Sequence, residues 1–291
     1  MTHDRPMTVP RVLEAPERGE RLVMLTAYDH PQAVTADEAG ADVVLVGDSL
    51  AMVVLGHPDT LSITVDEMLH HVKAVRRGVK RALLVADMPF GSFHLGPEQA
   101  TANAVRFVKE GGAQAVKIEG DRPEIVRALV AAEIPVMAHL GLTPQSLHRL
   151  GGYRVQGRED EARAKLLEAA VDLEAAGAFS LVLECIPAGL AAEVSERLAI
   201  PTLGIGAGVG CDGQVLVYHD LLGMGTSEKT PKFVRRYAEL GRDARDAIRR
   251  FADDVRSGRF PAPEESYGDA APVVTPMVPV DSESRLRKIY G

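Results

Sequence analysis

Eight short apolar runs alternate with helical segments along this chain, and that alternation restricts the folds open to it. The runs are nearly continuous stretches rich in Val, Leu and Ile, which is typical of parallel strands covered on both faces. They occupy residues 22–27, 43–46, 83–86, 115–118, 135–138, 181–183, 202–205 and 215–217. Because a doubly wound sheet usually has fewer strands, these eight alternations predict an α/β fold of the (β/α)8 TIM-barrel type.

The segments between the runs carry the start and stop signals of helices. Residues 64–77 begin with a Thr cap and acidic residues and end in two arginines before a glycine, which suits the helix dipole at both ends. Residues 97–110 open with Pro and stop at a Gly-Gly pair. Similar signals predict helices at 123–133 and 159–176.

Composition excludes several functions and locations. The net charge is −8, which argues against nucleic acid or an anionic membrane as a partner. The N-terminus has no apolar signal core, and charged residues and a proline interrupt the longest apolar stretch, at 125–142, so we expect no membrane span. Two cysteines, Cys185 and Cys211, cannot build a disulfide framework. A reducing cytoplasm is therefore the expected location.

The domain organisation predicted from composition is simple. We expect one catalytic barrel domain over residues 1–268, with a short N-terminal segment, and a C-terminal tail at 269–291. From residue 260 onward the chain is rich in Pro, Ser and acidic residues, and it ends in a basic stretch. Such composition is typical of an appendage or mobile tail, which can serve as an oligomer contact.

Polar and charged residues end most of the apolar runs. In a barrel of this kind, chemistry is located at the carboxyl ends of the strands, whereas a barrel selected only for stability needs no charges there. The residues at or just after these ends are Asp29, Asp48, Ser49, Asp87, Lys117, Glu119, His139 and Glu184.

Each of these residues also has a purely structural interpretation. Asp48 and Asp87 could cap the following helix or turn, and Lys117 with Glu119 could form a structural ion pair. His139 taken alone could be an ordinary core histidine. Because buried ion pairs stabilise a fold weakly, a mixed-charge cluster in a barrel mouth favours a functional site.

Taken together, the strand-end residues predict a metal-assisted reaction. Three carboxylates, on Asp48, Asp87 and Glu119, suit a hard cation such as Mg²⁺. Lys117 beside them would stabilise an anionic oxygen, and Glu184 would be free to act as a general base. This combination is typical of enolate formation from an α-keto acid held by Mg²⁺.

The glycine-rich stretch 204–210 follows the seventh run. It lacks the Lys-Ser/Thr of a P-loop and does not open a nucleotide-binding unit. It therefore indicates either a close approach of ligand to backbone or a tight turn.

Several long motifs, in one order, resemble ketopantoate hydroxymethyltransferases, also called 3-methyl-2-oxobutanoate hydroxymethyltransferases. The resemblance runs from about residue 10 to residue 268. The matching motifs are residues 26–29, 46–57, 86–92, 115–120, 139–146, 151–158 and 204–208.

This resemblance implies a barrel of the phosphoenolpyruvate/pyruvate class that transfers a hydroxymethyl group from 5,10-methylenetetrahydrofolate to 3-methyl-2-oxobutanoate. The product, ketopantoate, leads to pantothenate and coenzyme A. It implies Mg²⁺ at Asp48, Asp87 and Glu119, and the proton acceptor at Glu184. The implied keto-acid contacts are Asp48, Ser49, Asp87 and Lys117, with His139 also near the substrate. A cytoplasmic homodecamer is implied as well, whereas the tail extends past the usual end of the family.

Two other functions remain open from the residues. One is a lyase or mutase of the same barrel class, but these typically carry a reactive Cys in a Lys-Lys-Cys-Gly-His-type loop, which this sequence lacks. The other is a non-catalytic barrel that binds a small acid. Such a barrel would not need Lys117, Glu119 and Glu184 beside two aspartates.

Overall fold

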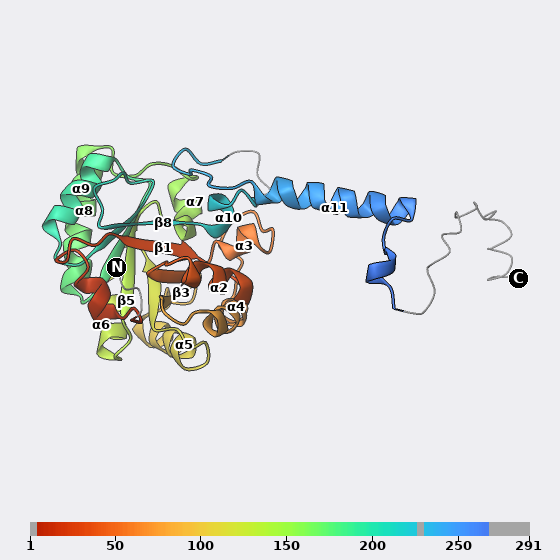
Figure 1. The fold of residues 1–291 in the computed structure, drawn as a ribbon. Helices are drawn as coiled ribbons and strands as arrows, with labels where there is room; N and C mark the ends of the chain where they lie inside the picture. Colours follow the sequence, from red (N-terminus) through yellow and green to blue (C-terminus); the bar gives the residue numbers. More distant parts are fainter. Residues whose placement is uncertain (1–4, 226–229, 268–291) are drawn as a thin grey trace, which may run out of the picture. The chain divides into compact units, whose positions relative to one another are not determined.

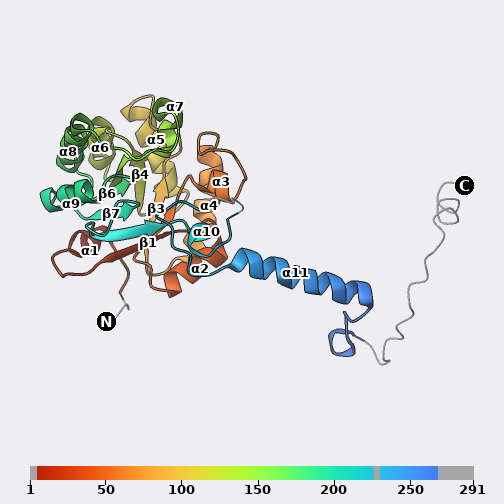
Figure 2. The same ribbon diagram turned by 90° about the horizontal axis from the view of Figure 1, so that it is seen from above.

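The computed structural model describes residues 5–225 and 230–267 and divides the chain into two compact units, Met1–Ala238 and Glu239–Gly291. All eight predicted strands are present in the first unit, and they pair in chain order as a closed parallel barrel (Figures 1 and 2). The strands are β1 (Leu22–Thr26), β2 (Val43–Val46), β3 (Leu83–Asp87), β4 (Ala115–Glu119), β5 (Val136–Gly141), β6 (Ser180–Glu184), β7 (Thr202–Ile205) and β8 (Gly213–Leu216).

The barrel helices include the four that the sequence predicts. Thr64 caps α4 through a capping box with Glu67, so the local signal and the structure agree. The helices of this unit are α1 (Val9–Leu13), α2 (His30–Glu38), α3 (Leu50–Val53), α4 (Val65–Gly78), α5 (Pro97–Lys109), α6 (Pro123–Ala131), α7 (Leu147–Leu150), α8 (Asp160–Ala175), α9 (Ala188–Arg197) and α10 (Tyr218–Leu221), with a 3₁₀ turn η1 (Pro144–Ser146). The short helices α1, α3, α7 and α10 were not predicted from the sequence.

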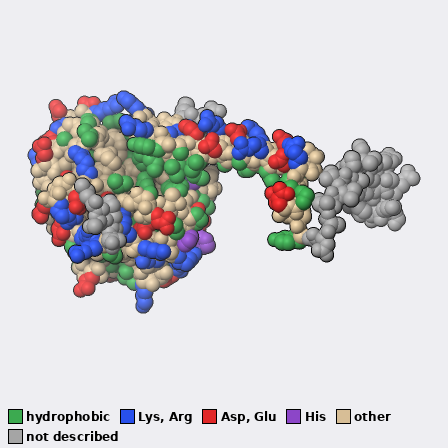
Figure 3. All heavy atoms as spheres, in the orientation of Figure 1, with side chains coloured by type: hydrophobic (Ala, Val, Ile, Leu, Met, Phe, Trp, Pro, Cys, Tyr) green, Lys and Arg blue, Asp and Glu red, His purple; other side chains and the backbone are tan. Residues whose placement is uncertain are grey.

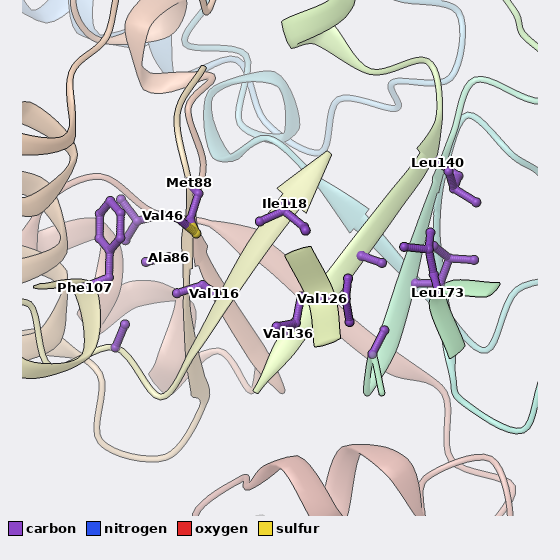
Figure 4. Close-up of a cluster of buried hydrophobic side chains, with 14 of the residues drawn as sticks. Val46, Ala86, Met88, Phe107, Val116, Ile118, Val126, Val136, Leu140 and Leu173 are labelled. Atoms are coloured by element: carbon purple, nitrogen blue, oxygen red, sulfur yellow. The ribbon is translucent and has the colours of Figure 1, made fainter. Parts of the chain in front are cut away.

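Buried side chains form two clusters on opposite faces of the sheet. The larger cluster lies between the strands and the surrounding helices, and Figure 4 shows part of it, with Phe107 of α5 and Val126 of α6 beside residues of the strands. The smaller cluster fills the inside of the barrel and includes Val12 of α1. Since Met7 N also donates to Arg81 O at 2.6 Å before β3, the N-terminal segment packs at the amino ends of the strands. The carboxyl ends are thereby left for the functional groups.

The second unit contains α11 (Leu240–Ser257) and a 3₁₀ turn η2 (Pro263–Glu265). No residue of α11 is buried, and charged side chains of both signs are interspersed along it (Figure 3). The predicted tail at 269–291 lies outside the described residues, and the predicted domain boundary at 268 stays a prediction. None of the described helices combines the length and the apolar character needed to cross a bilayer.

Candidate active site

All seven predicted site residues line one cavity of about 420 Å³ at the carboxyl ends of the strands. Strand register explains why they meet there: Asp87 lies beside Lys117, Glu119 beside His139, and Gly141 beside Glu184. Asp29 is the exception among the strand-end residues, because its carboxylate accepts from Gln32 N at 2.8 Å and caps α2. Helix capping therefore accounts for Asp29, whereas Asp48 and Asp87 line the cavity.

Three carboxylates converge at one side of the cavity. Asp48, Asp87 and Glu119 each offer an oxygen within 4.8 Å of the others, and the three side chains are almost fully buried. Buried like charges repel strongly, because little water screens them. Burial, together with Asp87 and Glu119, holds the pKa of Asp48 well above its usual range.

Lys117 offsets only part of this negative charge. Its Nζ donates to both oxygens of Asp87 at 2.8 Å and lies 3.7 Å from Oε1 of Glu119. Burial acts to lower the pKa of Lys117, but Asp87 and Glu119 outweigh burial and raise it, so the ammonium is charged at neutral pH. Three carboxylates against one ammonium leave an excess of negative charge.

That excess fits a divalent cation. The donor set consists of hard carboxylate oxygens converging within bonding reach of one ion, which is the preference of Mg²⁺ rather than of zinc. No zinc-like His/Cys group of three or more occurs among the described residues; the acidic triad is the one candidate metal group found there. The triad can therefore hold a metal ion.

Gln145, in the turn η1 after β5, joins two of these carboxylates, and its role was missed from the sequence. Its backbone N–H donates to Oε2 of Glu119 at 3.0 Å, and its Nε2 donates to Oδ2 of Asp48 at 2.9 Å. Nε2 also donates to the carbonyl oxygen of Met88 at 2.9 Å. Gln145 thereby leaves Oδ1 of Asp48 available to a cation, whereas Oε1 of Glu119 faces Lys117 and His139. A buried amide in the matching motif 139–146 was the only available signal.

Replacement of Gln145 by Met should therefore weaken divalent-cation binding by about 10- to 100-fold, the usual cost of losing a group that orients a metal ligand. Met keeps the side-chain size and the backbone N–H to Glu119, so only the two Nε2 bonds are lost. Mn²⁺ titration of the substrate-free protein by electron paramagnetic resonance measures the effect. Gln214→Met, which removes an exposed amide bond to Gly208 O, is the matched control. Equal Mn²⁺ affinity in both variants would contradict this role.

His139 lies between the triad and the predicted base. Its Nδ1 is 3.4 Å from Oε1 of Glu119, and its Nε2 is 3.3 Å from Oε2 of Glu184. Burial and Lys117 act to lower the pKa of His139, but the two flanking carboxylates outweigh them and raise it to about 9. Neither nitrogen meets hydrogen-bond geometry in the substrate-free protein, so the contacts are charge pairings. The imidazolium therefore lies between the carboxylates of Glu119 and Glu184.

Glu184 itself is set apart from the triad. It ends β6, and its side chain keeps 17% exposure, so it alone among the cavity's predicted carboxylates faces partly solvated space. Gly141 (φ +95°) makes this arrangement possible, since a Cβ there would overlap the carbonyl oxygen of Glu184. The amide of Leu142 donates to that same carbonyl at 2.8 Å. The chain after β5 is thereby packed directly against the base.

Ser49 begins α3, and a buried tyrosine holds its hydroxyl. The Oγ of Ser49 lies 2.8 Å from the hydroxyl of Tyr28, which is almost fully buried. Burial raises the pKa of Tyr28 above its usual value, so the phenol stays protonated. Ser49 is thereby held at the cavity wall beside Asp48.

At two glycines of the stretch 204–210, the backbone lies close to protein. A Cβ at Gly208 or Gly210 would collide with Ala188 or Ala192 of α9.

Cys185 lines the cavity, but burial raises the pKa of its thiol to about 11. That thiol is therefore protonated at neutral pH and is no nucleophile.

A closed parallel (β/α)8 barrel with a lysine, an acidic triad that can hold a metal ion and a separate carboxylate at its strand ends is typical of barrel enzymes. Comparison with known sequences narrows the class, because residues 6–263 match the family described as ketopantoate hydroxymethyltransferase. The chain belongs to this family, as the sequence resemblance implied.

Relatives and solved structures agree with this placement. The chain is 55% identical over 263 residues to the 3-methyl-2-oxobutanoate hydroxymethyltransferase of Carboxydothermus hydrogenoformans, covering 90% of this chain and 95% of that one. It is 56% identical over 259 residues to the enzyme of the same name from Oleidesulfovibrio alaskensis, covering 88% and 89%.

Among solved structures, the fold is similar to that of phosphonopyruvate hydrolase in complex with oxalate and Mg²⁺, with a TM-score of 0.57, 17% identity and coverage of 97% and 98%. It is also similar to 2,3-dimethylmalate lyase, a member of the PEP mutase/isocitrate lyase superfamily, with a TM-score of 0.56, 18% identity and coverage of 89% and 93%. These structures support the predicted (β/α)8 barrel fold.

Proposed function

We propose that this chain transfers a hydroxymethyl group from 5,10-methylenetetrahydrofolate to 3-methyl-2-oxobutanoate, giving ketopantoate for pantothenate and coenzyme A synthesis. Family membership supports the proposal. The observation that carries it is the presence, in one cavity, of a buried acidic triad with a lysine and of a separate carboxylate on Glu184. Removal of a carbon-bound proton next to a keto group is favoured by both groups, one to polarise the keto oxygen and one to accept the proton.

In this proposal Asp48, Asp87 and Glu119 hold Mg²⁺. Bound there, the cation would polarise the keto group of the substrate and so make the adjacent C–H more acidic. Asp48, Ser49, Asp87 and Lys117 contact the keto acid. Lys117 contributes a positive charge next to the oxygen on which negative charge develops, and its burial strengthens that interaction.

Glu184 takes the proton from the branched carbon next to the keto group. His139, paired with Glu184 at 3.3 Å, orients the carboxylate toward the substrate and also contacts the substrate side of the cavity. The carbanion that results is nucleophilic at this carbon, and it attacks the one-carbon unit of the folate. Water supplies the hydroxyl oxygen. Both C–N bonds that join the one-carbon unit to the folate break, while one C–C bond and one C–O bond form. The two folate nitrogens take up one proton from the water and the proton held by Glu184, and tetrahydrofolate leaves.

The size of the cavity supports a second substrate. A volume of about 420 Å³ is within the range of sites for drug-sized ligands and exceeds what a small branched acid fills.

The test is ketopantoate formation, measured by mass spectrometry with and without methylenetetrahydrofolate and Mg²⁺. We expect product only when both are present. If the protein instead cleaves 2-oxo acids to smaller acids without folate and forms no ketopantoate, it is a lyase. Keto-acid binding with no turnover under any condition would identify a non-catalytic barrel.

We also propose that the enzyme is a homo-oligomer, a homodecamer by family resemblance. The apolar side chains of α11 support self-association, because Ile248, Phe251 and Val255 recur at helical spacing and are 66%, 53% and 48% exposed. We expect light scattering to give a mass of ten 31.2 kDa chains. A mass of one chain at assay concentration would overturn the proposal.

The two free cysteines support a cytoplasmic location, which cell fractionation tests.

A further inference from the structure

Three side chains that line the cavity have no part in the proposed chemistry: Asp220 of α10, Phe233 and Tyr153. The triad and Glu184 account for the keto acid and its proton. These three side chains are therefore available to the larger substrate.

The start of α10 holds Asp220 in the cavity. The backbone N–H of Tyr218 donates to Oγ1 of Thr26 at 2.9 Å, which fixes the first turn of α10 against the end of β1. Asp220 follows two residues later and is partly buried. Its position in the cavity is thus set by the barrel itself.

The carboxylate of Asp220 has little hydrogen bonding from the protein. Among residues 5–225 and 230–267, no N–H or O–H group donates a hydrogen bond to it. Arg236 attracts it, yet burial has the larger effect and raises the pKa of Asp220 above its usual value. A ligand that donates hydrogen bonds should therefore bind favourably here, because it satisfies the two unused acceptor oxygens of a partly buried carboxylate.

The other cavity carboxylates are already engaged. Asp87 accepts from Lys117, Asp48 and Glu119 accept from Gln145, and Glu184 pairs with His139. Asp220 is therefore the acidic group of this cavity that is left for recognition.

Two aromatic side chains that line the same cavity suit a flat ring. Phe233 lies against the backbone at Gly206, where a Cβ would come within 2.9 Å of its ring. Tyr153 is 49% exposed, and its hydroxyl contacts Sδ of Met52 at 3.7 Å. Rings held in this way offer flat apolar faces with little loss of freedom on binding.

We propose that Asp220 binds the donor edge of the pterin ring of the folate substrate, while Phe233 and Tyr153 pack against the ring. A 2-amino-4-oxopterin presents its N3–H and its 2-amino group side by side. Two parallel donors match the two oxygens of one carboxylate, as in a bidentate arginine pair. This inference rests on the proposed function, because the pterin belongs to the proposed one-carbon donor.

The experiment is equilibrium binding of tetrahydrofolate, which lacks the transferable carbon and so cannot react. Asp220→Asn should weaken binding by about 10- to 100-fold, as expected for loss of a charged hydrogen-bonding partner. The native protein should bind an analogue with methyl in place of the 2-amino group about as weakly as Asp220→Asn binds tetrahydrofolate. Asp220→Asn should cost less affinity for that analogue than for tetrahydrofolate, because only one of the two donors that Asp220 recognises remains in it.

Asp59→Asn is the matched control. Asp59 is a partly buried aspartate at the same end of the barrel, does not line the cavity, and accepts from Leu61 N at 2.9 Å, a bond that Asn can keep. Folate-free exchange of the keto acid's C3 deuterium with solvent reports folding and the keto-acid site, and it should be native in both variants.

The outcomes separate this inference from the proposed function. If the native protein forms ketopantoate but Asp220→Asn binds tetrahydrofolate as tightly as native, the Asp220 assignment is wrong and the function stands. If the native protein neither binds tetrahydrofolate nor forms ketopantoate, the proposed function itself fails. Loss of deuterium exchange in Asp220→Asn would also overturn the assignment, since it would place Asp220 in the keto-acid half of the site.

Discussion

Replacement of Glu184 by Gln should lower turnover by about two to four orders of magnitude, the usual contribution of a positioned general base. The C3 proton of a branched 2-oxo acid is a weak acid, and polarisation of the keto group alone leaves a high barrier to its removal. Gln keeps the size of Glu184 and its contact with His139 but cannot accept the proton. Binding of the keto acid and of Mn²⁺ should therefore remain near native.

Solvent exchange of the substrate's C3 deuterium isolates this step, because exchange involves no folate. Nuclear magnetic resonance should show that exchange is lost in Glu184→Gln in parallel with turnover. Glu196→Gln, on the exposed surface of α9, is the control and should exchange at the native rate. If Glu184→Gln also exchanges at the native rate, Glu184 is not the base. His139, 3.3 Å away, is then the next candidate.

The barrel could be predicted because its signals are local. Continuous apolar runs identify strands buried on both faces, and caps such as Thr64 and stops such as the Gly-Gly pair after α5 delimit helices. Chain order then fixes the topology, because each strand pairs with the next. The carboxylates at the strand ends follow from the same pattern, since parallel strands bring their carboxyl ends to one side.

The rest of the site depends on contacts between distant segments. Gln145 reaches Asp48 across 97 positions of sequence, and a lone glutamine in a loop carries no signal of that bond. In the sequence, Asp220 cannot be distinguished from an aspartate at the start of any helix. It lies in the cavity because α10 follows β8 and Thr26 fixes the first turn of α10. The exposed helix α11 was missed although the sequence carries its signal, because Ile248, Phe251 and Val255 recur at helical spacing among charged residues. None of its residues is buried.

Asp48→Asn should abolish metal-dependent activity and yet stabilise the metal-free protein. Loss of one of three carboxylates should lower metal affinity and turnover by at least about 10²-fold. In the metal-free protein, however, Asp48 is a buried anion beside two others, and burial and these neighbours hold its pKa well above its ordinary value of 3.8. Folding therefore favours the protonated acid. Stability from this group falls as pH rises from 3.8 through the higher folded pKa, and Asn removes that loss.

Asp87→Asn should have the opposite effect on stability, although it also loses metal and activity. Burial raises the pKa of Asp87 as well, but here the loss of the ion pair outweighs that effect. Lys117 donates to both oxygens of Asp87 at 2.8 Å, so Asn leaves a buried ammonium with a much weaker partner. Breaking a buried pair from one side typically costs about 3–5 kcal/mol. In chelator at about pH 7.5, the unfolding temperature should therefore be highest for Asp48→Asn, intermediate for the native protein and lowest for Asp87→Asn.

The contrast between the two aspartates separates a metal site from a structural ion cluster. If the cluster served stability alone, both substitutions would lower the unfolding temperature, and added Mg²⁺ would not change the native protein. If it holds a cation, Mg²⁺ raises the unfolding temperature of the native protein, since a ligand that binds only the folded state stabilises it, and neither variant responds. Full activity of Asp87→Asn in chelator would contradict the metal assignment outright, because two carboxylates, one of them beside Lys117, cannot replace the hydration shell of a hard cation.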